Sequence, residues 1–158
     1  MAQEIERKFL VLNDNWREDA GPGVYISQGY LGEAKGASVR VRVEGERANI
    51  NIKGATLGIS RTEYEYPIPL DDALEMLKNL CLKPLIEKSR YKVKVGNHTW
   101  EVDLFTGDNA GLIVAEVELE SEDQPFEKPA WAGDEVSDDA RYYNACLVKH
   151  PYKDWHDR

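Results

Sequence analysis

Charged side chains alternate with apolar ones along the first stretch of the chain, residues 4–11. Because the side chains of a β-strand point alternately to two faces, Glu4, Glu6 and Lys8 would share one face of such a strand. Glutamate and lysine are uncommon in strands, so strand propensity does not account for this pattern. Two carboxylates beside an ammonium group favour a site for a metal ion and an anion.

The spacing of two recurs in later stretches, and each of them carries mainly one sign of charge on that face. The acidic pairs are Glu63 and Glu65, Glu101 and Asp103, and Glu116 and Glu118. The basic residues are Arg40 and Arg42, Lys88 and Arg90, and the single Lys53. A solvent-facing sheet also alternates, which is the competing interpretation of any one strand. The separation of the signs by strand favours a shared interior face.

Opposed acidic and basic strands suit one kind of ligand. Arginine binds phosphate oxygens in a fork, and lysine acts on them as a point charge. Carboxylates would repel a polyanion unless cations lie between them, and Mg²⁺ joins carboxylates to phosphate oxygens in this way. The pattern therefore predicts a metal–polyphosphate site, which defines a substrate class and not yet a reaction.

Alternation and turn residues predict eight short strands, at residues 4–11, 24–31, 38–44, 47–53, 61–68, 86–95, 98–105 and 112–120. Helical spacing predicts a helix over 71–80 with Asp71 as its N-cap, and Ser137 would cap a second helix that ends near Lys149. We expect one helical turn around Trp16. Loops are expected at 32–36 and 54–60, irregular chain at 121–135 and a frayed tail over 150–158.

Short connections favour antiparallel neighbours, and two helices cannot cover eight strands unless the sheet curls. We therefore expect a mainly β (α+β) fold, an eight-stranded antiparallel closed β-barrel with a charged lumen, a mid-chain helix and a C-terminal helix. The apolar outer faces would need helices, loops, aromatic residues or a second subunit as cover. No repeat or linker divides the sequence, so residues 1–158 are expected to form a single domain.

The net charge of −9 argues against a general nucleic-acid or membrane-surface binder. No apolar run approaches the ~20 residues of a membrane span, and the sequence opens without a basic and apolar leader. Cys81 and Cys146 fit two ordinary thiols in a reducing compartment better than one disulfide. We expect a cytoplasmic protein.

The charged residues follow one another in an order that resembles the CYTH superfamily, the triphosphate tunnel metalloenzymes. Residues 4–8 match the Glu-x-Glu-x-Lys signature of that family. The other matching segments are Val39-Arg40-Val41-Arg42, Lys53, Glu63-Tyr64-Glu65, Glu87-Lys88-Ser89-Arg90-Tyr91, Glu116-Val117-Glu118 and Arg141-Tyr142-x-Asn144. The short opening and the compact size are most similar to the bacterial branch with inorganic triphosphatase activity.

The resemblance implies a role for each matching residue. The ligands of the main metal would be Glu4, Glu6 and Glu118. The residues that bind a second metal or orient water would be Glu63, Glu65 and Glu116. The phosphate cradle would consist of Lys8, Arg40, Arg42, Lys53, Lys88 and Arg90. The groups that support catalysis would be Lys8, Tyr30 and Lys88, with Tyr30 acting beside Lys8. Further tunnel candidates are Asp103 and Arg141.

The reaction implied is the hydrolysis of inorganic triphosphate (tripolyphosphate) to pyrophosphate and phosphate with Mg²⁺ or Mn²⁺. The partner would be a small-molecule triphosphate, and the protein would be a monomer or a homodimer. The alternatives are a class IV-type adenylate cyclase or a thiamine triphosphatase of the same superfamily, and a non-catalytic polyphosphate- or nucleotide-binding module. No nucleobase pocket is recognisable in the sequence, which favours tripolyphosphate. The sequence does not identify a general base.

Overall fold

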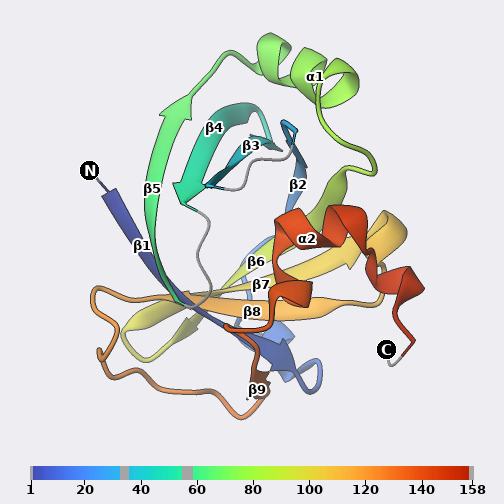
Figure 1. Cartoon of the computed structure of the whole chain (residues 1–158). Helices are drawn as coiled ribbons and strands as arrows, with labels where there is room; N and C mark the ends of the chain where they lie inside the picture. The colour runs from blue at the N-terminus through green and yellow to red at the C-terminus, as the bar shows by residue number, and fades with distance from the viewer. Residues whose placement is uncertain (1, 33–35, 55–58, 157–158) are drawn as a thin grey trace.

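A computed structural model describes residues 2–32, 36–54 and 59–156 of the chain (Figure 1). Its strands are β1 (Ala2–Val11), β2 (Val24–Tyr30), β3 (Ala37–Glu44), β4 (Arg47–Gly54), β5 (Ser60–Pro67), β6 (Ile86–Val95), β7 (His98–Thr106), β8 (Ile113–Glu118) and β9 (Ala132–Glu135). Its helices are α1 (Leu70–Asn79) and α2 (Asn144–Lys149), and its 3₁₀ turns are η1 (Asn15–Asp19), η2 (Gly107–Asn109), η3 (Ala140–Tyr142) and η4 (Tyr152–Asp154). The loops predicted at 32–36 and 54–60 lie partly outside the described residues.

Eight of these strands close into an antiparallel barrel. The sheet order is β5-β4-β3-β2-β6-β7-β8-β1-β9, and an additional pairing of β5 with β1 joins the strands into a ring. Two-residue turns connect β3 to β4 and β6 to β7. Gly45 and Gly96 take φ angles of 61° and 60° there, a left-handed conformation that glycine adopts without strain. The predicted eight-stranded closed barrel is confirmed.

The ninth strand, β9, was not expected, because residues 121–135 were predicted to be irregular. It is only four residues long, and its sequence Ala-Gly-Asp-Glu has no apolar alternation. Its backbone pairs with the second half of β1, where Phe9 faces Glu135 and Val11 faces Ala132. Pairing with a neighbouring strand therefore defines this element, which local sequence does not encode.

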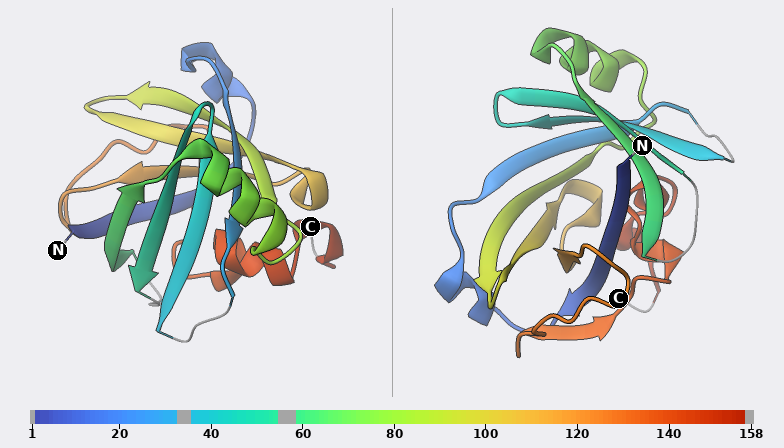
Figure 2. Two further views of the ribbon diagram at one scale, coloured as in Figure 1. Left: turned by 90° about the horizontal axis from the view of Figure 1, so that it is seen from above. Right: turned by 90° about the vertical axis from the view of Figure 1, so that its left-hand side faces the viewer.

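Helix α1 lies over the outer face of β3 and β4, as Figure 2 shows. Its buried residues Ala73 and Leu77 pack in one cluster with Val41 of β3. The predicted helix is confirmed, but the prediction that Asp71 is its N-cap is wrong. The helix begins one residue earlier, so that Pro69 is the N-cap and Asp71 lies in the first turn.

The C-terminal helix is shorter than predicted, and Ser137 is not its cap. The Ser137 hydroxyl accepts a hydrogen bond from the Lys8 amide at 2.9 Å and donates one to Glu135 at 2.7 Å. The barrel wall therefore uses the group that would have capped a helix. Asp139 caps the 3₁₀ turn η3, and the extended backbone of Tyr143 separates that turn from α2.

A second part of the outer apolar surface is covered by aromatic residues from two connections. Trp16 of η1 and Trp131 of the segment before β9 are both buried, and they pack with Trp100 on the outside of the barrel. The predicted helical turn at Trp16 is thus confirmed. Within the parts of the chain that the structure describes, no helix is long and apolar enough to cross a membrane.

One end of the barrel interior is apolar. Ile86, Phe105 and Val114 lie on the same strand faces as the charged residues two positions away, and they pack with Leu147 of α2 and with Trp155. Trp155 is only 5% exposed, so the prediction that the tail frays is wrong for this residue. The C-terminal segment fills this end, which leaves the other end of the interior for the charged residues.

Candidate active site in the barrel

The charged end of the barrel is a cavity of about 1060 Å³, whose wall carries eight basic and seven acidic side chains. Every residue predicted to bind metal or phosphate lines it: Glu4, Glu6, Lys8, Arg40, Arg42, Lys53, Glu63, Glu65, Lys88, Arg90, Glu116 and Glu118. Tyr30 lines it as well. The nearly equal numbers of the two signs suit a ligand that brings both charges, such as a metal ion with a polyphosphate.

Strands β1 and β8 place their carboxylates side by side. In the antiparallel register Glu6 lies opposite Glu118, and Lys8 lies opposite Glu116. Burial and the neighbouring Glu116 carboxylate raise the pKa of Glu6 well above its ordinary value. Burial and the carboxylates of Glu4 and other neighbours also raise the pKa of Glu118. On this wall, burial and neighbouring carboxylates therefore make both Glu6 and Glu118 harder to ionise.

The pKa of Glu116 is shifted in the opposite direction, to a lower value. Burial alone would raise its pKa, but the Lys8 ammonium, a hydrogen bond with Glu6 and the Arg90 guanidinium hold it well below the usual range. Lys8 Nζ lies 3.7 Å from Glu116 Oε2, and Arg90 Nη2 lies 3.1 Å from Glu116 Oε1. Of the two adjacent carboxyl groups, Glu116 therefore ionises more readily, and Glu6 holds a proton more strongly.

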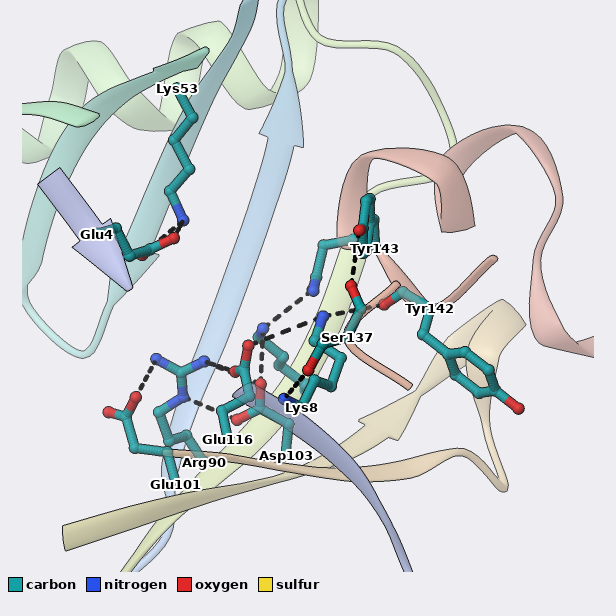
Figure 3. Close-up of polar contacts among 12 residues, drawn as sticks. Glu4, Lys8, Lys53, Arg90, Glu101, Asp103, Glu116, Ser137, Tyr142 and Tyr143 are labelled. Atoms are coloured by element: carbon teal, nitrogen blue, oxygen red, sulfur yellow. Dashed lines mark hydrogen bonds and ion pairs between the residues drawn. The ribbon is translucent and has the colours of Figure 1, made fainter. Parts of the chain in front are cut away.

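Asp103 lies behind the cavity wall and organises two of its bases. It is completely buried and accepts two hydrogen bonds from Arg90, at 2.7 and 2.9 Å. Figure 3 shows Arg90 held between Asp103, Glu101 and Glu116. Lys88 Nζ lies 2.8 Å from the same Asp103 carboxylate, and its burial lowers the pKa of Lys88 to about 7. Asp103, predicted as a tunnel residue, thus contacts the cavity through Lys88 and Arg90.

At the opposite wall, Lys53 of β4 reaches across to Glu4 of β1. The Lys53 ammonium donates to both Glu4 oxygens, at 3.1 and 2.9 Å (Figure 3). Arg61 lies 3.4 Å from Glu4 on its other side, and its guanidinium stacks 5.7 Å from the ring of Tyr143. Although burial alone would raise the pKa of Glu4, these cations lower it, so this carboxylate is ionised.

Strands β3 and β4 supply two arginines and a buried amide. Burial and the neighbouring Arg40 lower the pKa of Arg42 to about 10. Arg40 Nε is a buried donor without a hydrogen-bond partner among the described residues. Asn51 Nδ2 donates to Glu63 at 3.0 Å and to Glu65 at 2.9 Å. Arg40 and Arg42 repel each other, and Arg40 Nε is a hydrogen-bond donor that is free among the described residues. The pair is therefore suited to bind an anion.

Two predicted relationships look different in the structure. The Tyr30 hydroxyl lies 3.2 Å from Gln28 Nε2, while Lys8 Nζ donates to the Tyr142 carbonyl at 3.1 Å. These contacts do not support the pairing of Tyr30 with Lys8. Arg141 is absent from the cavity lining described here; it is exposed on the surface, 3.1 Å from Asp139.

Several residues that contact the site had been given no role there by sequence reasoning: Gln28, Asn51, Arg61, Glu101, Tyr143 and Asn144. Four of them lie on the inward strand faces; the alternation had already identified Glu101 and could also have found Gln28, Asn51 and Arg61. Tyr143 and Asn144 come from the C-terminal segment. The course of this segment was mispredicted, because Ser137 forms hydrogen bonds with the barrel wall instead of capping a helix.

The donor set fits a hard divalent cation, since it consists of carboxylates at the crowded wall of β1 and β8. Among the residues that the structure describes, however, no three acidic, histidine or cysteine side chains are arranged as a ready-made metal site. Lysines and arginines bind the carboxylates instead, as the Lys53 contact with Glu4 illustrates. Binding of a metal and a polyanion would require both sets of residues to exchange partners.

Comparison with known proteins places this barrel in a family. The CYTH domain matches residues 2–144. An inorganic triphosphatase of Acetivibrio thermocellus is 50% identical over 155 residues, 98% of this chain and 99% of the relative. An inorganic triphosphatase of Nitrosomonas europaea is 37% identical over 149 residues, 92% of this chain and 96% of the relative.

Solved structures agree with this match. The crystal structure of the inorganic triphosphatase NE1496 superimposes with a TM-score of 0.66 at 35% sequence identity. The superposition covers 94% of this chain and 95% of that structure. The length of the match, its identity and the shared barrel agree, and the chain belongs to the CYTH domain family.

Proposed function

We propose that this protein hydrolyses inorganic triphosphate to pyrophosphate and phosphate in the charged cavity of the barrel, with the help of a divalent metal ion. The observation that carries the proposal is the cavity wall, where bases suited to phosphate alternate with carboxylates suited to a metal. Relatives that match nearly the whole chain, at 50% and 37% identity, are inorganic triphosphatases. The same observations do not favour adenylate cyclase, thiamine triphosphatase or binding without catalysis.

The phosphate chain would be bound by the basic residues, which are Lys8, Arg40, Arg42, Lys53, Lys88 and Arg90. Arg40 supports this assignment, because its buried Nε has no partner among the described groups and is available to a phosphate oxygen. Lys53 would exchange Glu4 for phosphate. These bases would offset the negative charge of the phosphoryl group in transfer and of the leaving pyrophosphate.

The metal would be held by Glu4, Glu6 and Glu118, with a second ion or a water molecule at Glu63, Glu65 and Glu116. Mg²⁺ and Mn²⁺ are the proposed metals, because all of these ligands are carboxylates. When bound, such an ion polarises phosphoryl oxygens and orients the attacking water. Glu6, whose pKa is raised by burial and by Glu116, would lose its proton to become a ligand.

Lys8 and Lys88 would support the reaction from the floor of the cavity. Both are buried, and both are held by groups of the protein: Lys8 by the Tyr142 carbonyl and Lys88 by Asp103. Fixed ammonium groups need little reorganisation when charge develops on the substrate. Tyr30 would contact the substrate from the cavity wall, independently of Lys8.

We also propose a cytoplasmic protein that acts as one domain, as a monomer or homodimer, on a small-molecule triphosphate and not on nucleic acid. The described thiols of Cys81 and Cys146 are free, which suits a reducing compartment. The net charge of −9 disfavours nucleic acid. The C-terminal segment packs inside the barrel, which supports a single domain.

The test of this function is a substrate panel with Mg²⁺ or Mn²⁺: tripolyphosphate, thiamine triphosphate, ATP and a longer polyphosphate. We expect the highest kcat/KM with tripolyphosphate, measured as phosphate release. Cyclic AMP from ATP with little phosphate from tripolyphosphate would show a cyclase instead. Tight binding of tripolyphosphate without any phosphate release would show a binding module.

A further inference from the structure

The side chain of Asn144, at the start of α2, contacts Lys88 of β6 and Gln28 of β2. Lys88 Nζ of β6 donates to Asn144 Oδ1 at 3.0 Å, and Gln28 Nε2 of β2 lies 3.4 Å from the same oxygen. Gln28 Oε1 in turn accepts a hydrogen bond from Arg42 Nε of β3 at 2.9 Å. One amide oxygen thus connects the C-terminal segment to two proposed phosphate-binding residues.

These contacts fix where Lys88 can point. A lysine ammonium has three donors. One is directed at Asp103, 2.8 Å away, and one at Asn144, so a single donor remains for the cavity. Because Lys88 is 1% exposed, water cannot replace a lost partner easily. Without Asn144, the ammonium would lose one of the two anchors that direct its third donor.

Gln28 is held in a similar way. It is completely buried, its oxygen faces Arg42, and its nitrogen faces Tyr30 and Asn144. With Arg42 Nε bound to Gln28, the terminal nitrogens of the guanidinium are left for the cavity. Asn144 therefore acts on Arg42 through one intervening amide and on Lys88 directly.

We propose that Asn144 is a positioning residue that orients Lys88, and through Gln28 also Arg42, toward the phosphate chain of the substrate. The proposal rests on the proposed function for the identity of the ligand. It gives the C-terminal segment a second role beside packing, because the segment that fills the apolar end also aligns bases at the charged end.

A matched control exists in the same chain. Asn109 of η2 is a buried amide whose oxygen accepts a hydrogen bond from the Tyr152 amide at 2.9 Å. It also holds the C-terminal segment, but it is absent from the described cavity lining. Asn109→Leu should therefore loosen the segment as Asn144→Leu does, without disturbing the bases.

The experiment measures tripolyphosphate binding by calorimetry in EDTA, and kcat/KM against pH with metal, for wild type, Asn144→Leu, Asn144→Asp and Asn109→Leu. A hydrogen bond to a charged group is lost in Asn144→Leu, so we expect Kd to rise about tenfold or more. Asn109→Leu should lower the Tm and leave Kd unchanged.

The dependence of kcat/KM on pH distinguishes a positioning role of Asn144 from a role in packing alone. The charged groups that face Lys88 are Asp103, Arg90, Arg42 and Glu116. Lys88 would bind phosphate as an ammonium, so its deprotonation should lower kcat/KM at alkaline pH. In Asn144→Leu the ammonium loses an acceptor, so this alkaline fall should move to lower pH. In Asn144→Asp the ammonium gains a negative neighbour, so the fall should move to higher pH. Asn109→Leu should keep the wild-type profile.

Wild-type Kd and wild-type pH profile in a folded Asn144→Leu would overturn the inference. If that variant does not fold, Asn144→Asp decides: a profile that stays in place or moves to lower pH contradicts the proposal. The proposed function fails separately, when wild type releases no phosphate from tripolyphosphate. The binding measurement in EDTA then still tests whether Asn144 orients the bases.

Discussion

The two ends of the barrel interior are built from the same strands but have opposite characters. On β6, Ile86 faces the apolar end, and Lys88, two residues later, faces the charged end. On β8, Val114 and Glu116 make the same change. The apolar end is filled by Leu147 and its neighbours from the C-terminal segment. The charged end is left as a cavity.

The difference shows how one barrel supports both stability and binding. Packing of apolar side chains at one end stabilises the fold, since each buried aliphatic residue contributes about 1.5–3 kcal/mol. Buried ion pairs contribute little, because desolvation offsets their attraction. The pairs at the charged end, such as Lys53 with Glu4, can therefore exchange partners for a ligand without endangering the fold.

The largest effect is expected from a charge placed at the apolar end. Leu147 is completely buried, so Leu147→Glu loses its packing and buries an unpaired carboxylate. We expect a destabilisation of more than ~5 kcal/mol, seen as loss of cooperative thermal unfolding. The control Leu147→Met keeps the volume and should stay within about 1.5 kcal/mol of wild type. A cooperative Leu147→Glu protein with wild-type Tm would show that this end is not packed.

At the charged end, Arg40→Ala is expected to lower activity without lowering stability. Loss of a group that stabilises phosphoryl charge should lower kcat/KM by about 10²–10³-fold. The Tm should not fall, because the substitution removes a like-charge neighbour of Arg42. Arg47→Ala, at an exposed position beside the β3–β4 turn, is the control and should keep wild-type kinetics. Unchanged kinetics in Arg40→Ala would place that arginine outside the site.

A smaller effect is expected from Glu6→Gln in metal-free protein. Burial and Glu116 raise the pKa of Glu6 in the folded state, so the folded state binds a proton that the unfolded state releases above its own pKa. Glu6 therefore costs wild type stability as the pH rises toward the folded-state pKa. Thermal melting in EDTA should show Glu6→Gln gaining stability over wild type at pH 8 and little at pH 4. An advantage that is the same at both pH values would argue against a protonated Glu6.

The smallest effect is expected from Arg141→Ala. Arg141 lies outside the cavity lining and forms a half-exposed ion pair with Asp139, the kind of pair that contributes about 1 kcal/mol or less. We expect kcat/KM to remain at the wild-type value and the urea midpoint to fall slightly. A tenfold loss of activity would show that Arg141 contributes to the site, as the sequence resemblance suggested.

Much of the barrel was predictable, because its strands alternate strictly and the alternation assigns charged residues such as Arg40 and Glu116 to one face. The same alternation placed Lys88 in the site, but it could not reveal that Asp103 and Asn144 hold it. Asp103 lies on the neighbouring strand of the same hairpin, but alternation alone does not show which side chains touch. Asn144 is 56 residues from Lys88, in a segment whose local signals mispredicted the helix start. Strand β9 was not predicted for a related reason, because only its pairing with β1 defines it.

The charged end of the barrel is proposed to be a metal-dependent triphosphatase site. The most direct test follows the products of tripolyphosphate after removal of divalent metal and after its return. We expect pyrophosphate and phosphate in equal amounts with Mg²⁺ or Mn²⁺, no turnover in EDTA, and recovery when metal is added back. Equal rates with and without metal, or no products under any condition, would contradict a metal-dependent triphosphatase site.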